Sequence, residues 1–199
     1  MKRLTYAALG IFVFTLFVPS RSVEAGEATE QLNATISSFV TILSSTPVAE
    51  LQSKGLPENA RQLVFARFDF SEMTKRSLGS HWSSLEPAEQ REFVDAFTQR
   101  ILVSYGRTVR SSVGDKIEFG REVREGQQAS VETKVISGRG AELPIGYRLH
   151  DIDGQWKVYD VIIDQMSLVN NYRAQFERVI AKSSIKNLLQ IMKEQGRTS

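Results

Sequence analysis

The chain has 199 residues, of which 25 are Lys or Arg, 23 are Asp or Glu and none is Cys. A chain of this length is long enough to bury one substantial hydrophobic core, and without cysteine its fold must be held by packing and not by disulfides. The near balance of charge removes the main compositional support for nucleic-acid binding.

Residues 1–25 are predicted to form a cleavable signal peptide. A basic Lys2-Arg3 start precedes an apolar run from Ala7 to Val18, and Val23-Glu24-Ala25 has small residues at the positions that signal peptidase reads. The apolar run is short for a bilayer span of roughly 20 residues, so an uncleaved membrane anchor is the less favoured alternative. We expect cleavage after Ala25, export of the protein and one mature domain over residues 26–199.

Removal of this leader changes the charge of the protein. The leader contains three of the 25 basic residues and one of the 23 acidic residues, which leaves 22 of each in the mature chain. The pI of 8.9 for the full chain therefore overstates the basicity of the mature protein.

The first half of the mature chain is predicted to be helical. Apolar residues recur at helical spacing over 27–44 and, after interruptions at Pro47 and 55–57, over 59–66. A further helix follows Phe68-Asp69-Phe70, with Asp69 or Ser71 as N-cap and Gly79 as its end.

The longest helix is predicted to run from Pro87 to about 112–114. Proline is favoured in the first turn of a helix. Phe93, Phe97, Ile101 and Tyr105 then follow at intervals of four residues, which places them on one face.

From Lys116 the apolar period changes from helical to alternating. Strands are predicted over 117–123, 129–136, 143–149 and 156–163, separated by turn signals that include Asp153-Gly154. Four strands joined by short turns predict an antiparallel meander.

The stretch from Trp156 to Phe176 organises the rest of the chain. Alternation predicts that Tyr159, Val161 and Ile163 share one strand face and that Trp156, Val158, Asp160 and Ile162 share the other. Ser167 then suits the N-cap of an amphipathic helix, and a last short helix is expected over 185–192. The predicted fold class is α+β, with helices wrapped around one twisted four-stranded antiparallel sheet that encloses an apolar cavity. This arrangement is similar to the NTF2-like or cystatin-like cone, which is an analogy of shape.

Standard catalytic, nucleotide-binding and metal-binding motifs are absent from the sequence, so we expect no enzyme activity, metal or cofactor. His81 is interpreted as a turn residue and His150 as a residue on a wet strand face. Asp160 stands out as a carboxylate in an apolar strand. It is interpreted as a structural acid that bonds a backbone group or an Arg; the alternative is a general base beside Tyr147 or Tyr159 in a hydrolase or isomerase.

Several separated segments resemble the MlaC or toluene-tolerance family of periplasmic phospholipid-binding proteins. They are the Trp156–Phe176 run with its Asn170-Asn171-Tyr172-Arg173 segment, Phe68-Asp69-Phe70 followed by Leu78-Gly79 and Trp82, and the spacing from Trp82 to Tyr105. The resemblance covers essentially the whole mature chain.

The resemblance implies a monomeric, non-catalytic carrier that shuttles phospholipid between the outer and inner membranes and maintains outer-membrane lipid asymmetry. The implied partners are an inner-membrane ABC transporter with an MCE-domain subunit and an outer-membrane lipoprotein complex. A carrier of another lipid, such as a hopanoid, is an alternative. The expected lipid-binding residues are Leu78, Trp82, Phe97, Tyr105, Tyr147, Tyr159, Val161, Ile163, Leu168, Tyr172 and Phe176.

Overall fold

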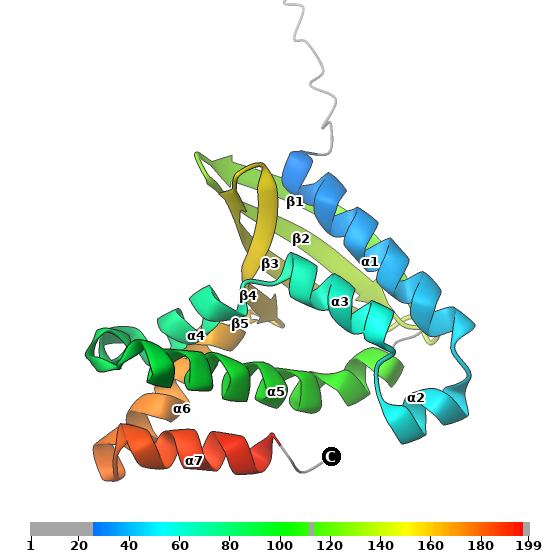
Figure 1. The fold of residues 1–199 in the computed structure, drawn as a ribbon. Helices are drawn as coiled ribbons and strands as arrows, with labels where there is room; N and C mark the ends of the chain where they lie inside the picture. The colour runs from blue at the N-terminus through cyan, green and yellow to red at the C-terminus, as the bar shows by residue number, and fades with distance from the viewer. Residues whose placement is uncertain (1–25, 112–113, 197–199) are drawn as a thin grey trace, which may run out of the picture.

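The computed structural model describes residues 26–111 and 114–196. Helices precede and follow one antiparallel sheet, as the alternation of apolar periods predicts (Figure 1). In chain order the elements are α1 (Glu27–Ser45), α2 (Val48–Lys54), α3 (Glu58–Arg67), α4 (Phe70–Leu78), the 3-10 helix η1 (Gly79–Ser84), α5 (Pro87–Ser111), β1 (Lys116–Glu125), β2 (Gln128–Ile136), β3 (Glu142–Ile152), β4 (Gln155–Ile163), β5 (Met166–Ser167), α6 (Leu168–Lys182) and α7 (Ile185–Gln195). The expected leader lies outside the described residues.

The sheet has five strands in the order β1-β2-β3-β4-β5, so the prediction of four strands is wrong. The meander itself is confirmed, because each strand pairs antiparallel with the next. The missed strand, β5, has only two residues, which are too few to show an alternating pattern. It is joined to β4 through Asp164 and Gln165, both with positive φ (47° and 65°), and this pair is not a usual hairpin signal.

The long predicted helices are confirmed, whereas two short ones were missed. The N-caps of α4 and α6 are Asp69 and Ser167, whose side chains accept hydrogen bonds from backbone amides of the first turn. The two missed helices, α2 and η1, are each only about two turns long, which is too short to show a helical period.

Helix α1 lies across one face of the sheet, here called the inner face (Figure 1). A bulge in β1 between Phe119 and Glu122 turns the Glu122 carboxylate toward the first turn of α1. There it accepts hydrogen bonds from Thr29 N at 2.8 Å and from Thr29 Oγ1 at 2.6 Å. Because α1 has no side-chain cap of its own at Gly26, this carboxylate supplies the missing acceptor.

A half-buried arginine, Arg67, joins α1, α3 and β4. The Arg67 guanidinium donates to Thr35 Oγ1 and Gln31 Oε1, each at 2.9 Å, and to the carbonyl oxygen of Trp156. Gln31 Oε1 also accepts from Trp156 N at 3.0 Å. Burial lowers the pKa of Arg67 from its ordinary value of 12.5.

The apolar side chains form two main clusters. The sheet cluster packs α1 against the inner face; its buried members are Ala28, Leu32, Ala129, Val131, Leu149, Trp156 and Val158. The helical cluster joins α4, α5, α6 and α7; its buried members include Met73, Leu78, Phe93, Phe97, Leu168, Tyr172, Phe176, Leu188 and Met192. The inner face of the sheet is therefore packed mainly by α1, whereas α4, α5, α6 and α7 pack on one another in a separate layer.

Candidate functional site

A bulge in β4 determines which side chains face which layer. Leu149 pairs with Val158 and Arg148 pairs with Asp160, so Tyr159 is an extra residue on the β4 side. The prediction that Tyr159 shares a face with Val161 and Ile163 is therefore wrong. The bulge reverses the alternation, so that Val158 and Val161 both pack in the sheet cluster.

Burial falls along the inner face of β3 and β4, from Leu149 and Val158 toward Leu143 and Ile163. Leu149 and Val158 are 0% exposed. In the next row Tyr147 pairs with Val161, and both side chains are half-buried. Leu143, further along the same face, is 36% exposed. Apolar side chains thus continue beyond the cover of α1.

Tyr147 retains accessible surface although its surroundings disfavour charge. Burial raises the pKa of its phenol above the ordinary 10.0, and a hydrogen bond with Thr133 acts in the opposite direction. The phenol of Tyr147 is therefore poorly solvated, although part of the side chain remains accessible.

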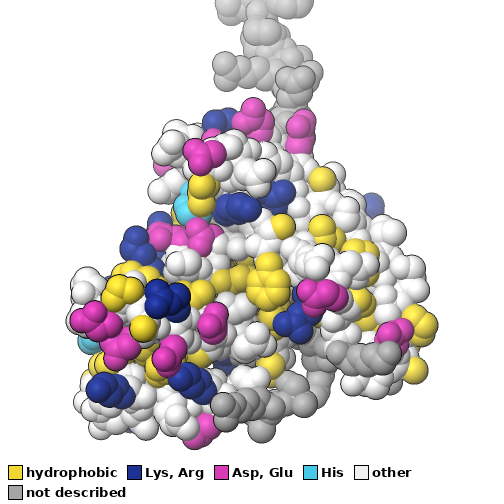
Figure 2. Space-filling view, in the orientation of Figure 1, with side chains coloured by type: hydrophobic (Ala, Val, Ile, Leu, Met, Phe, Trp, Pro, Cys, Tyr) yellow, Lys and Arg dark blue, Asp and Glu magenta, His cyan; other side chains and the backbone are white. Residues whose placement is uncertain are grey.

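Apart from Tyr159, which is 6% exposed on the outer face of the sheet, the expected lipid-binding residues divide into three groups. Tyr147, Val161 and Ile163 are half-buried and lie on the inner face. Leu78, Phe97, Leu168, Tyr172 and Phe176 are at most 6% exposed and pack on one another in the helical cluster. Trp82 and Tyr105 are half-buried at the margin of that cluster. Figure 2 shows hydrophobic side chains gathered on the surface between α3 and α5.

Contacts between aromatic rings explain why the residues of the helical cluster expose so little surface. The Phe97 ring meets Tyr172 edge-on at a centroid distance of 5.1 Å and Phe176 at 5.9 Å. Tyr105, on the same face of α5, is more open. Burial, and then the nearby Tyr172, raises the pKa of Tyr105 above 10.0, while Arg100 lowers it.

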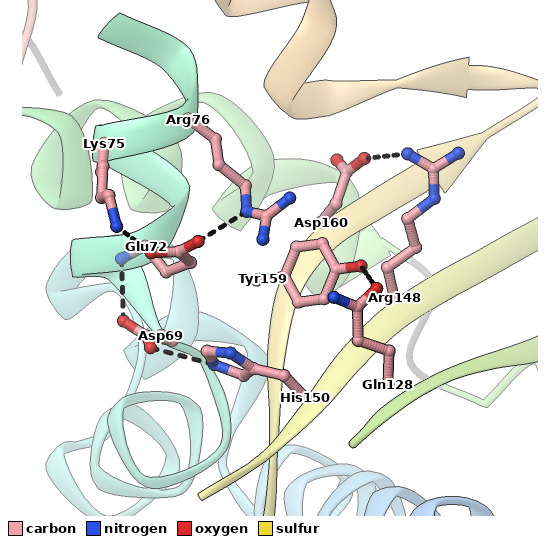
Figure 3. Close-up of polar contacts among 9 residues, drawn as sticks. All are labelled: Asp69, Glu72, Lys75, Arg76, Gln128, Arg148, His150, Tyr159 and Asp160. Atoms are coloured by element: carbon pink, nitrogen blue, oxygen red, sulfur yellow. Dashed lines mark hydrogen bonds and ion pairs between the residues drawn. The ribbon is translucent and has the colours of Figure 1, made fainter. Parts of the chain in front are cut away.

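Asp160 occupies the opposite, outer face of the sheet, toward α4 and α6 (Figure 3). Its Oδ2 accepts from Ser167 Oγ at 2.7 Å and from Arg148 Nη1 at 3.2 Å. Its Oδ1 accepts from Val169 N at 3.1 Å, in the first turn of α6. Both carboxylate oxygens are engaged, and Tyr147 lies on the other face. These contacts agree with the interpretation of Asp160 as a structural acid that binds a backbone amide and an Arg.

His150 is half-buried beneath α4, so the prediction of a wet strand face is wrong. Its Nε2 lies 3.0 Å from Asp69 Oδ2, and its ring meets that of Tyr159 at 5.4 Å. The Tyr159 ring is covered by the Arg76 guanidinium at 4.2 Å. The strand alternation placed His150 on the correct face, but it contained no signal that α4 would cover that face.

His81 lies in η1, where its Nε2 is 3.2 Å from Glu177 Oε2. Within residues 26–111 and 114–196, His, Asp and Glu form no group that fits a metal ion. No helix in this described part is long and apolar enough to cross a membrane.

Comparisons with known proteins agree with the resemblance seen in the sequence. Residues 33–194 match the family model described as MlaC protein. The toluene tolerance protein ttg2D of Pseudomonas putida is 30% identical over 91 residues, which are 45% of this chain and 42% of that relative. The match therefore spans less than half of that curated protein's length.

A solved structure shares the fold. It is the phospholipid-binding protein from Ralstonia solanacearum in complex with a phospholipid. The TM-score is 0.76 at 19% identity, and the superposition covers 86% of this chain and 97% of that one.

Proposed function

This chain belongs to the MlaC protein family, and from that premise we propose that it is a phospholipid-binding carrier and not an enzyme. The relative from Ralstonia solanacearum, which has the same fold, binds a phospholipid.

The observation that carries the proposal is the apolar inner face beyond α1. A soluble protein gains nothing from keeping a row of aromatic and β-branched side chains half-exposed, unless a ligand covers them. Burying one methylene contributes about 0.8 kcal/mol, so an acyl chain of about 14–18 carbons contributes on the order of 10 kcal/mol. Such a ligand needs few polar contacts, which fits a site with no polar motif in the sequence.

The proposed acyl-chain wall is narrower than the sequence-based set. It comprises Tyr147, Val161 and Ile163 on the sheet, with Tyr105 and Trp82 from the helical layer. The buried residues Leu78, Phe97, Leu168, Tyr172 and Phe176 are left out of this wall, because they pack on one another in the helical cluster and expose little surface to a ligand. Tyr159 is not part of it.

The cellular role follows from family membership and remains part of the proposal. We propose that residues 1–25 are a signal peptide, that residues 26–199 act in the periplasm as a monomer, and that the carrier moves lipid between the outer and inner membranes. Its proposed partners are an outer-membrane lipoprotein complex and an inner-membrane ABC transporter with an MCE-domain subunit. The expected result of this transport is outer-membrane lipid asymmetry.

Mass spectrometry of an organic extract from the purified mature protein tests the proposal. Diacyl phospholipid in near-stoichiometric amount is expected. A hopanoid or another lipid in its place would make the chain a carrier of that lipid. A lipid-free extract from protein that circular dichroism shows to be folded would contradict the carrier function.

The proposed export has its own test. N-terminal sequencing of protein recovered from the periplasm is expected to begin at Gly26. Full-length protein retained in the membrane fraction would show that the Ala7–Val18 run is an anchor.

A further inference from the structure

Four cationic side chains converge on a pocket of about 260 Å³ on the outer face of the sheet. Lys75 and Arg76 reach it from α4, Arg148 from β3 and Arg173 from α6. Its other lining residues are Gly79, Tyr159, Asp160, Val169 and Asn170. Arg173 belongs to the Asn170–Arg173 segment that was prominent in the sequence, and the proposed carrier function does not use its guanidinium.

The two carboxylates at this pocket are already engaged. Glu72 pairs with Arg76 Nε at 2.8 Å and with Lys75 Nζ at 3.4 Å. Asp160 pairs with Arg148 and caps α6. Figure 3 shows Arg76 and Arg148 approaching Tyr159 and Asp160 from opposite sides. The pocket is thus lined by four cations and one carboxylate, Asp160, and even with Glu72 counted beside it a net positive charge remains.

Among the four cations, Lys75, Arg76 and Arg148 have carboxylate partners, whereas Arg173 differs. Within residues 26–111 and 114–196 its guanidinium has no hydrogen-bond acceptor or acidic partner. It lies against Gly79, where an added Cβ would be 3.1 Å from Nε and Nη2 of Arg173. Gly79 has φ +56° and ends α4, so the negative end of that helix dipole holds the guanidinium in place.

We propose that this pocket binds a phosphoryl group. Guanidinium forks match the geometry of phosphate oxygens, and converging like charges are stabilised when an anion lies between them. The volume admits a phosphate with a short ester substituent but not a folded peptide segment. Because Tyr147 and Arg148 are neighbours on opposite faces of β3, the sheet separates this pocket from Tyr147, Val161 and Ile163, the part of the proposed acyl-chain wall that lies on the inner face. The phosphoryl group therefore comes from outside the protein, either as a lipid headgroup on a membrane surface or as free phosphate or a small phosphate ester.

Calorimetric titration with inorganic phosphate at constant ionic strength tests the pocket. Saturable binding is expected, and Arg173→Gln should weaken it about tenfold or more, because charge-assisted hydrogen bonds are lost. Arg173→Lys keeps the charge but not the fork and should give an intermediate affinity. Arg178→Gln, the same change at another exposed position of α6, should leave the affinity unchanged. If Arg173→Gln does not fold, Lys75→Gln replaces it, since that side chain is 56% exposed.

Vesicle co-sedimentation identifies the source. Binding to vesicles of phosphatidylglycerol and phosphatidylcholine in equal parts that is lost in Arg173→Gln assigns the pocket to lipid headgroups. Phosphate binding without vesicle binding assigns it to free phosphate or a small ester. Absence of saturable binding in both assays, or equal weakening by Arg178→Gln, would overturn the proposal. None of these outcomes depends on whether the inner face carries an acyl chain.

Discussion

At the scale of single residues, the conspicuous carboxylate of the sequence has a structural task. Asp160 is 2% exposed and joins β3, β4, β5 and α6 through its contacts to Arg148, Ser167 and Val169. A buried acid with both oxygens engaged is held by its donors and is poorly placed to accept a proton from a substrate. The sequence alone identified the residue as unusual but left both interpretations open, because the donors come from separate elements.

Asp160→Asn should therefore lower stability and not a turnover rate. The amide cannot accept from Ser167 and Val169 as two carboxylate oxygens do, so a loss of about 2–4 kcal/mol in unfolding free energy is expected. Arg148→Gln, which removes a partner that is 47% exposed, should cost about 1 kcal/mol or less. Urea denaturation measures both, and bound lipid measured on the same samples should be largely retained. A specific turnover activity that Asp160→Asn abolishes would contradict the structural role.

Tyr147 is expected to make the stability of the fold decrease with pH in the alkaline range. Its raised pKa means that the folded protein keeps the phenol proton at pH values where the unfolded chain has lost it. The free energy of unfolding is therefore unaffected by this phenol below pH 10.0, and it decreases as the pH rises from there through the folded-state pKa. Tyr147→Phe removes this pH dependence, so the urea midpoint of the variant should fall less than that of the wild type between about pH 9 and about pH 11. Parallel curves for the two proteins would show that Tyr147 is well solvated.

At the scale of elements, the sequence predicted the helices and strands better than the faces they present. Long helices and the meander follow from apolar period and turn residues, and these were confirmed. The bulge at Tyr159 was not predictable, since one extra residue in a strand leaves no mark on an alternating pattern that is apolar on both sides. Because of this bulge, Tyr159 lies on the outer face and not on the predicted wall.

The β1 bulge has a measurable effect on α1. Glu122→Gln keeps the size of the side chain but removes the negative charge at the helix N-terminus, and a loss of about 1–2 kcal/mol is expected. Glu125→Gln, at an exposed position of the same strand, is the matched control and should change stability little. Thermal unfolding followed by circular dichroism measures both variants. Equal effects of the two substitutions would mean that the Glu122 contacts to Thr29 do not stabilise α1.

At the scale of the whole molecule, the division into a sheet cluster and a helical cluster is what makes a lipid site possible. In a single merged core, apolar side chains on both faces of the sheet would be fully buried. Here Tyr147 and Val161 keep accessible surface on the inner face. The sequence-based set of site residues mixed members of both clusters. Helical spacing shows that Leu168, Tyr172 and Phe176 face inward, but it does not show whether a side chain or a ligand lies opposite them.

Two valines on the inner face of β4 test the central claim most directly. Val158 is 0% exposed in the sheet cluster, whereas Val161, on the same face, is half-buried at the proposed wall. Bound lipid and circular dichroism are measured on Val161→Glu and Val158→Glu. The account predicts that Val161→Glu is folded but carries little lipid, because water entering the emptied site hydrates the charge. Val158→Glu should unfold, since a charge in a dry core costs several kcal/mol. A folded Val161→Glu protein with its full complement of lipid, or one that unfolds as Val158→Glu does, would contradict the proposed site.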